Sequence, residues 1–131
     1  MHDPAGAPHA PPKGPLSGIR IIDWTVWQLG PVASSMLGDL GAEIIKIEER
    51  EQGDGGRAMF VHPDDGSSPF WELMNRNKKS VAIDLKNPEG LEVARRLIDG
   101  ADVFIQNFRP SVADKIGLGY ETLRARNPGL I

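Results

Sequence analysis

The sequence contains no cysteine, which excludes disulfide bonds, cysteine nucleophiles and thiolate metal ligands. It has no apolar run near the roughly 20 residues that a membrane-spanning helix needs, and no apolar signal core near its start. Positive charge is not in excess either, because the formal net charge is -3. These features predict a cytoplasmic protein without a membrane or nucleic-acid partner. A length of 131 residues allows one domain with a modest core.

Proline is concentrated at the start of the chain. Residues 1–15 combine proline with alanine and glycine, which leaves almost nothing to bury, so we predict a disordered tail over this range. His2 and His9 lie in this tail, and no ordered third partner accompanies them. We therefore predict no metal site.

Short apolar runs alternate with amphipathic segments from residue 16 onward. Strands are expected at 18–24, 43–48, 80–85 and 102–106, and helices from Gly30-Pro31, Asn87-Pro88, Pro110 and Tyr120, with a helical turn near 70–74. This alternation predicts an α/β fold, a Rossmann-like open, mostly parallel sheet with flanking helices. Residues 127–131 are typical of the start of a fifth strand. We therefore expect residues 16–131 to be the N-terminal part of a larger domain, incomplete as they stand.

Ligands of open α/β sheets bind beyond the carboxyl ends of the strands. This rule selects segments that are rich in polar residues, glycine and proline: 25–31, 48–57, 84–87 and 107–109. The segment after the first strand lacks the three glycines of a dinucleotide-binding turn, and Gly117-Leu118-Gly119 follows a helix instead of a strand. No phosphate-binding lysine loop of the Walker type occurs. The residue pattern alone therefore predicts where on the sheet a ligand binds, but it does not identify the ligand.

An ordered series of motifs resembles the class III CoA-transferases, such as the formyl-CoA and carnitine CoA-transferases. The motifs lie at residues 16–23, 30–31, 40–48, 53–57, 75–80 (NRNKKS), 84–90, 101–103, 107–110 and 118–120. The resemblance extends over residues 16–131. It implies transfer of coenzyme A between an acyl-CoA and a carboxylic acid, with no tightly bound cofactor and with an interlocked homodimer for the full-length protein.

The resemblance also implies which residues contact coenzyme A. The matching positions are Gln28, Leu29, Ile83, Asp84, Leu85, Lys86, Asn107, Phe108, Arg109 and Lys115. Among them, Lys86 is the cation expected on a phosphate, and a solvated lysine at a strand end is the alternative. Two positions depart from the family: Lys115 stands where members often carry arginine, and Glu49 stands where some relatives place an arginine, for which Arg50 is the candidate substitute. The charges of Lys78 and Lys79 are expected in a solvated loop.

Gln28 is the candidate residue at the reaction centre. By resemblance, its side chain lies beside the acyl group and donates a hydrogen bond to developing negative charge. The alternative is a glutamine that only anchors the loop before a helix. Asp23 matches a structural position of the family, and Trp27 either lines the acyl pocket or simply packs.

The family's nucleophile has no counterpart in these residues. Class III enzymes form an enzyme aspartyl-CoA thioester, and their nucleophilic aspartate matches no aspartate here, so we expect it beyond Ile131 and expect this chain alone to be inactive. Two other functions stay open. One is an α-methylacyl-CoA racemase, and the other is a non-catalytic piece that binds CoA or another subunit. The sequence names neither the acyl donor nor the acceptor.

Overall fold

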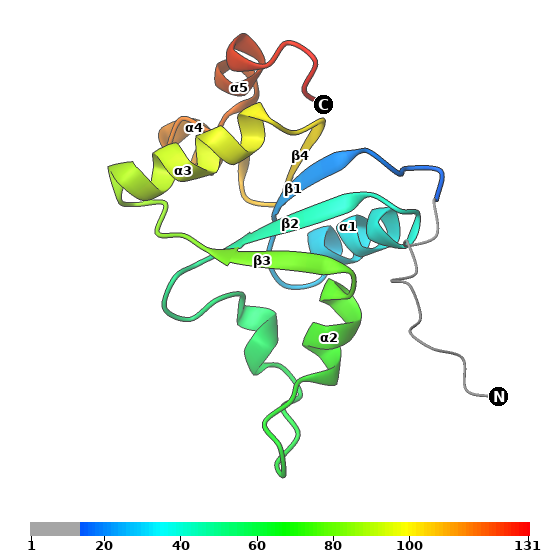
Figure 1. Ribbon diagram of the computed structural model, residues 1–131. Coiled ribbons are helices and arrows are strands. Elements are labelled where there is room, and N and C mark those ends of the chain that lie inside the picture. Colours follow the sequence, from blue (N-terminus) through cyan, green and yellow to red (C-terminus); the bar gives the residue numbers. More distant parts are fainter. Residues whose placement is uncertain (1–13) are drawn as a thin grey trace, which may run out of the picture.

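The computed structural model describes residues 14–131, and residues 1–13, with His2 and His9, lie outside the described range. Four parallel strands form one open sheet, in the order β3-β2-β1-β4 (Figure 1). They are β1 (Arg20–Trp24), β2 (Glu43–Glu48), β3 (Lys78–Ala82) and β4 (Val103–Gln106). Ile22 on β1 lies opposite Ile45 and Phe104 on its two neighbours. The predicted α/β fold with an open parallel sheet is confirmed.

Helices cover both faces of this sheet. They are α1 (Leu29–Asp39), α2 (Pro69–Asn75), α3 (Pro88–Asp99), α4 (Pro110–Lys115) and α5 (Tyr120–Arg126), with a short 3₁₀ turn, η1 (Gly55–Ala58), in the long connection after β2. Figure 1 shows α3, α4 and α5 on one side of the sheet and α1 on the other. Each predicted helix is therefore present. Among residues 14–131, no helix has the length and apolar character needed to cross a bilayer.

The two faces of the sheet differ in chemistry. Alternate side chains of a strand point to opposite faces. On the side of α3, α4 and α5, the strands contribute Ile22, Trp24 and Ile47 to an apolar core that also holds Ile98 and Leu123. This face carries most of the hydrophobic burial that stabilises the domain.

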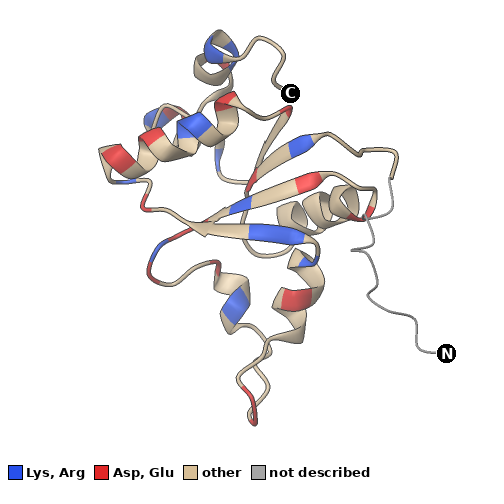
Figure 2. Ribbon diagram, in the orientation of Figure 1, with Lys and Arg blue, Asp and Glu red and all other residues tan. Residues whose placement is uncertain are grey.

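The opposite face, toward α1 and α2, is largely ionic. Its only small apolar cluster among the described residues contains Ile21, Ala42 and Ile44, at the amino ends of β1 and β2. Further along the strands, Asp23 lies opposite Lys46 in the sheet register. Charged positions of both signs are visible on the strands themselves (Figure 2). The sheet therefore packs α1 and α2 partly through charges, which the apolar strand pattern did not indicate.

Three of the four strands differ in extent from the predictions, and the smallest difference is in β4, which begins at Val103 instead of residue 102. β1 begins at Arg20 and not at residue 18, because Gly18 (φ 95°) belongs to a preceding turn. β3 spans Lys78–Ala82, whereas 80–85 was expected. The difference arises because the Lys78 side chain is buried under α1, while the chain after Ile83 turns: the amide of Lys86 donates to Asp84 Oδ1 at 2.9 Å.

The helix boundaries follow local capping chemistry. Asn87 precedes α3, its side chain accepts the amide of Glu89 at 2.8 Å, and Pro88 occupies the first turn, as predicted. No fifth strand is assigned among the described residues. Ile131 nevertheless donates to the carbonyl of Asp102 (3.0 Å) and accepts from the amide of Phe104 (2.9 Å), which is the pattern of a parallel partner of β4.

Candidate functional site

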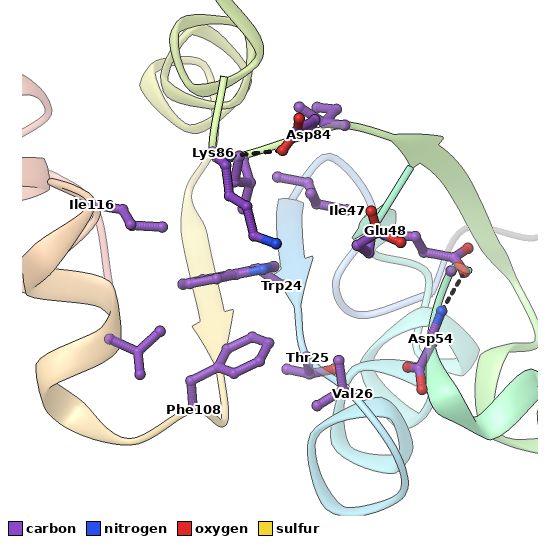
Figure 3. Close-up of a pocket in the computed structure, with 15 residues that line it drawn as sticks. Trp24, Thr25, Val26, Ile47, Glu48, Asp54, Asp84, Lys86, Phe108 and Ile116 are labelled. Carbon is purple, nitrogen blue, oxygen red and sulfur yellow. Dashed lines mark hydrogen bonds between the residues drawn. The ribbon is translucent and has the colours of Figure 1, made fainter. Parts of the chain in front are cut away.

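A cavity of about 340 Å³ opens at the carboxyl ends of the strands (Figure 3). Every segment selected by the sheet-edge rule contributes to its lining or supports it. The lining residues are Trp24, Thr25, Val26, Ile47, Glu48, Glu49, Gly53, Asp54, Ile83, Asp84, Leu85, Lys86, Phe108, Val112 and Ile116. A volume of this size lies in the range of small-molecule sites. The position is the one at which open α/β sheets bind ligands.

The cavity has an apolar wall and a cation at its opening. The ring of Trp24 packs on Phe108 with centroids 4.3 Å apart, and Phe104 stacks behind it at 6.3 Å. Lys86 is exposed, and its side chain reaches over Trp24 in Figure 3. No carboxylate of residues 14–131 pairs with its ammonium group. A flat apolar group and a nearby anion would match this arrangement.

Five of the predicted contact residues line this cavity: Ile83, Asp84, Leu85, Lys86 and Phe108. They come from the turn after β3 and the loop after β4. The structure therefore brings together residues that lie more than twenty positions apart in the sequence. Whether they bind coenzyme A stays a prediction.

The other predicted residues lie outside the cavity wall. Asn107 instead joins two loops, because its amide accepts from Val26 N (3.0 Å) and donates to Val26 O (2.9 Å). Arg109 and Lys115 are exposed at the two ends of α4. Asn107 thus holds the loop after β1 against the loop after β4, which supports the cavity from behind.

Gln28 and Leu29 lie at the start of α1 and do not belong to the lining of the cavity. Leu29 is 82% exposed. Gln28 is also exposed and precedes the helix, and its side chain caps no helix amide. Both interpretations of Gln28, as a residue at the reaction centre and as an anchor of the loop before the helix, stay predictions.

The ionic face of the sheet contains a buried pair under α1. Asp23 is fully buried and accepts hydrogen bonds from Thr25, from Ser34 Oγ (2.6 Å) and from Lys78 Nζ (2.9 Å). The Lys78 side chain is 2% exposed. Burial lowers the pKa of Lys78, and the charge of Asp23 opposes that shift. The expectation that Lys78 lies in a solvated loop is wrong, because β3 begins at this residue and turns its side chain inward.

Lys79 is exposed, but it is not in a loop. It lies on β3, where its side chain points to the other face and pairs with Glu43 at 2.6 Å. Since β3 is an edge strand of the described sheet, a side chain on that face remains in solvent while its neighbour is buried. The face to which each side chain points, and not the residue type, decides which of the two lysines is solvated.

A second buried pair lies next to the cavity. Lys46 Nζ approaches Asp54 Oδ2 at 2.9 Å, and both side chains are 1% exposed. Lys46 Nζ also donates to the carbonyl of Thr25 (2.6 Å), and Asp54 Oδ2 accepts no hydrogen bond from the described residues. Asp54 Oδ1 accepts the amides of Trp27 (3.0 Å) and Gly56 (2.8 Å). Asp54 therefore connects the loop after β1 to the loop after β2.

Glu48 forms the third charged contact of this face. Arg57 binds its carboxylate with two hydrogen bonds, of 2.7 and 2.8 Å, and Ser80 donates a further one. Burial alone would raise the pKa of Glu48, but the hydrogen bonds from Arg57 and Ser80 hold it below its ordinary value. The Arg57 guanidinium also lies over the Trp71 ring, 3.9 Å from its centroid.

These carboxylates are poor nucleophile candidates in their present environment, because each is engaged by a cation or by several donors. Sequence reasoning missed the roles of Lys46, Asp54 and Ser34. One signal was available: Lys46 interrupts an isoleucine run at a position that alternation places on one face. Among residues 14–131, no cluster of three or more histidine, aspartate or glutamate side chains is arranged to hold a metal ion.

An open parallel sheet with a largely apolar cavity at its carboxyl edge is the arrangement of α/β domains that bind ligands at this edge. The chain belongs to CoA-transferase family III, whose family model matches residues 16–131. The resemblance drawn from the motifs is thereby confirmed.

Several relatives of the chain are named as CoA-transferases. The chain is 47% identical over 125 residues to succinate–glutarate CoA-transferase of Agrobacterium fabrum, which covers 91% of this chain and 31% of that protein. It is 41% identical over 120 residues to succinyl-CoA–D-citramalate CoA-transferase of Chloroflexus aurantiacus, with coverage of 92% and 30%. The chain thus spans about 30% of the length of these relatives.

A solved structure shows the same fold. A CAIB/BAIF family protein from Brucella suis superposes with a TM-score of 0.83 at 37% sequence identity. The match covers 91% of this chain and 32% of that protein. The arrangement of strands and helices described above is therefore that of the corresponding third of a larger relative.

Proposed function

We propose that the protein to which this chain belongs transfers coenzyme A from an acyl-CoA to a carboxylic acid. Membership of CoA-transferase family III and the names of the relatives support this activity. The observation that carries the proposal is the cavity at the carboxyl edge of the sheet, because it holds five of the residues that the family resemblance assigns to coenzyme A.

In the proposed complex, the adenine end of coenzyme A enters this cavity. The wall formed by Ile83, Leu85 and Phe108 suits a flat heteroaromatic ring, and Lys86 at the opening suits a phosphate. Coenzyme A is much longer than the cavity. The rest of the molecule would extend over the exposed surface near Asn107, Arg109 and Lys115, outside the wall.

The proposed chemistry is double displacement on an enzyme carboxylate. An aspartate outside these 131 residues attacks the thioester carbonyl, forms a mixed anhydride and releases the CoA thiolate. The thiolate then attacks the aspartyl carbonyl and releases the donor acid, which leaves an aspartyl-CoA thioester. The acceptor acid reverses these steps. Gln28, which is exposed and lies two residues after the cavity-lining Val26, would donate a hydrogen bond to the oxyanion.

Three carboxylates of this chain are bound by cations, which is consistent with a nucleophilic aspartate outside residues 1–131. Asp23 and Asp54 are each buried against a lysine. Glu48 is bound by Arg57. An aspartate that must attack a thioester needs an accessible oxygen, which buried and paired carboxylates do not offer. Because the aspartate nucleophile of the family also matches no aspartate of this sequence, we propose that residues 1–131 alone carry no transfer activity, and that the full-length enzyme is an interlocked cytoplasmic homodimer.

The test is an exchange assay on the full-length protein. A panel of acyl-CoA donors is incubated with free acids, including succinate and glutarate, and the CoA thioesters are separated by chromatography. Transfer to at least one acid, together with trapping of the aspartyl thioester by borohydride or hydroxylamine, is the expected result. Exchange of the α-proton of an acyl-CoA without transfer would replace the proposal by racemase activity. CoA binding without any turnover would favour a non-catalytic role.

A further inference from the structure

The loop between β1 and α1 has a conformation that its own sequence does not favour. Trp27 has φ 68°, in the left-handed region that a bulky side chain rarely adopts. It directly precedes Gln28, the exposed residue at the start of α1. A conformation of this kind persists only where surrounding contacts impose it. The contacts that impose it therefore also fix where Gln28 points.

Lys46 on β2 and Asp54 in the connection after β2 supply those contacts. Lys46 Nζ donates to the carbonyl of Thr25 at 2.6 Å, and Asp54 Oδ1 accepts the amide of Trp27 at 3.0 Å. The same Asp54 oxygen accepts the amide of Gly56 at 2.8 Å. The ion pair thus holds two successive peptide units before Gln28. Lys46 binds the carbonyl of Thr25, and Asp54 binds the amide of Trp27.

The side chain of Trp27 is held by the same segment. A Cβ atom on Gly55 would lie 2.7 Å from the Trp27 ring, so the ring rests directly against this glycine. The amide of Asp54 in turn donates to Glu48 Oε2 at 3.2 Å, which fixes the Gly55 segment to the end of β2. Backbone and side chain of Trp27 are therefore both set by residues 53–56.

We propose that the buried Lys46–Asp54 pair positions Gln28 for the transfer reaction by imposing the left-handed conformation of Trp27. The inference rests on the proposed function, since Gln28 is the residue assigned to the acyl group. A buried ion pair adds little net stability compared with a well-packed apolar pair. Its directional contacts with the loop give it a role that an apolar pair of the same volume would not perform.

The experiment uses the full-length protein and two readouts. The first is steady-state kinetics, which separates kcat from the KM for the CoA thioester. The second is hydrogen exchange by mass spectrometry on peptides that span residues 25–28, which needs no activity. Asp54→Ala removes the carboxylate that accepts the amides of Trp27 and Gly56. The double variant Lys46→Met with Asp54→Asn removes the ion pair without leaving an unpaired buried charge. Asp39→Asn, at the far end of α1, is the matched control.

The expected result is faster exchange in residues 25–28 and a kcat that is lower by about 10²-fold, with KM changed less than about threefold. The double variant keeps an amide oxygen for Trp27, so its kcat loss should be smaller, about tenfold. Asp39→Asn should match the wild type in both readouts, which shows that loss of any carboxylate near α1 is not the cause.

Two results would overturn the inference. One is a folded double variant whose loop exchange and kcat equal those of the wild type. The other is a proportional change of kcat and KM in all variants, the control included, which would indicate general damage. A wild-type enzyme without transfer activity would refute the proposed function instead. The exchange data would still decide whether the pair holds the loop.

Discussion

The buried pair of Asp23 and Lys78 allows a stringent test of the ionic face of the sheet. In Lys78→Met the side chain keeps much of its volume, so little cavity cost is expected. The Asp23 carboxylate would keep its bonds from Thr25 and Ser34 but lose its only cation among the described residues. Removing one partner of a buried pair costs about 3–5 kcal/mol. That is a large fraction of the roughly 5–15 kcal/mol of a typical domain.

The adjacent residue provides the control. Lys79→Met removes the same charge one position along β3, but this side chain is 73% exposed and its pair with Glu43 is solvated. The expected loss is about 0–1 kcal/mol. Both variants and the wild type are compared by urea unfolding at pH 7, followed by circular dichroism, with free energies taken from the linear extrapolation.

Removal of both charges should restore stability. Asp23→Asn combined with Lys78→Met removes both charges, so the double variant should recover most of the stability lost in Lys78→Met. If Lys78→Met loses no more stability than Lys79→Met, the pair is not isolated from water as described. If the double variant is less stable than Lys78→Met, the loss comes from packing and not from an uncompensated charge.

Three further predictions concern the cavity and its surroundings. Lys86→Ala should weaken CoA binding by about 10- to 150-fold, since a charge-assisted phosphate contact contributes about 1.5–3 kcal/mol, and titration calorimetry should show a smaller loss for dephospho-CoA if the ribose phosphate is the partner; equal affinities for wild type and variant would leave Lys86 as a solvated lysine. Gln28→Ala should lower kcat by about 10²–10³-fold with little change in CoA affinity, and full turnover would remove Gln28 from the reaction. Burial raises the pKa of Glu48, but the hydrogen bonds from Arg57 outweigh this and lower it, so the stability from this carboxylate is present above the unfolded-state pKa and is lost as the pH falls through the folded-state pKa. Thermal unfolding between about pH 5 and pH 3 should therefore be less sensitive to pH in Arg57→Leu than in the wild type, and identical profiles would contradict the pairing.

Periodicity and capping residues predicted most of the fold. The alternation of apolar runs with Pro-initiated helices indicated a parallel α/β sheet, and Asn87-Pro88 fixed the start of α3. The boundary of β3 was wrong because Lys78 is charged, and charge on a strand usually indicates solvent. Only the tertiary structure supplies Asp23, which lies 55 residues away and makes burial of that lysine possible.

The candidate site was predicted less completely. The sheet-edge rule and the family motifs selected Lys86 and Phe108, which line the cavity. Motif matching also selected Asn107, which supports the loop after β1 and does not face the cavity. Lys46 and Asp54 were missed because their partners are backbone groups of a distant loop. A sequence pattern contains side-chain chemistry and spacing, but it does not contain the carbonyl and amide positions that such residues recognise.

The unequal faces of the sheet have a consequence for misfolding. Side chains of a strand alternate with a period of two, so a slip of β2 by one residue would exchange its faces. Lys46 would then enter the hydrophobic core beside Ile98, and Ile47 would replace it among Asp54 and the loop amides. Each error leaves a buried charge without a partner, whereas an all-isoleucine strand would tolerate the slip. The charges on one face thus disfavour incorrect strand registers during folding, before any ligand can bind.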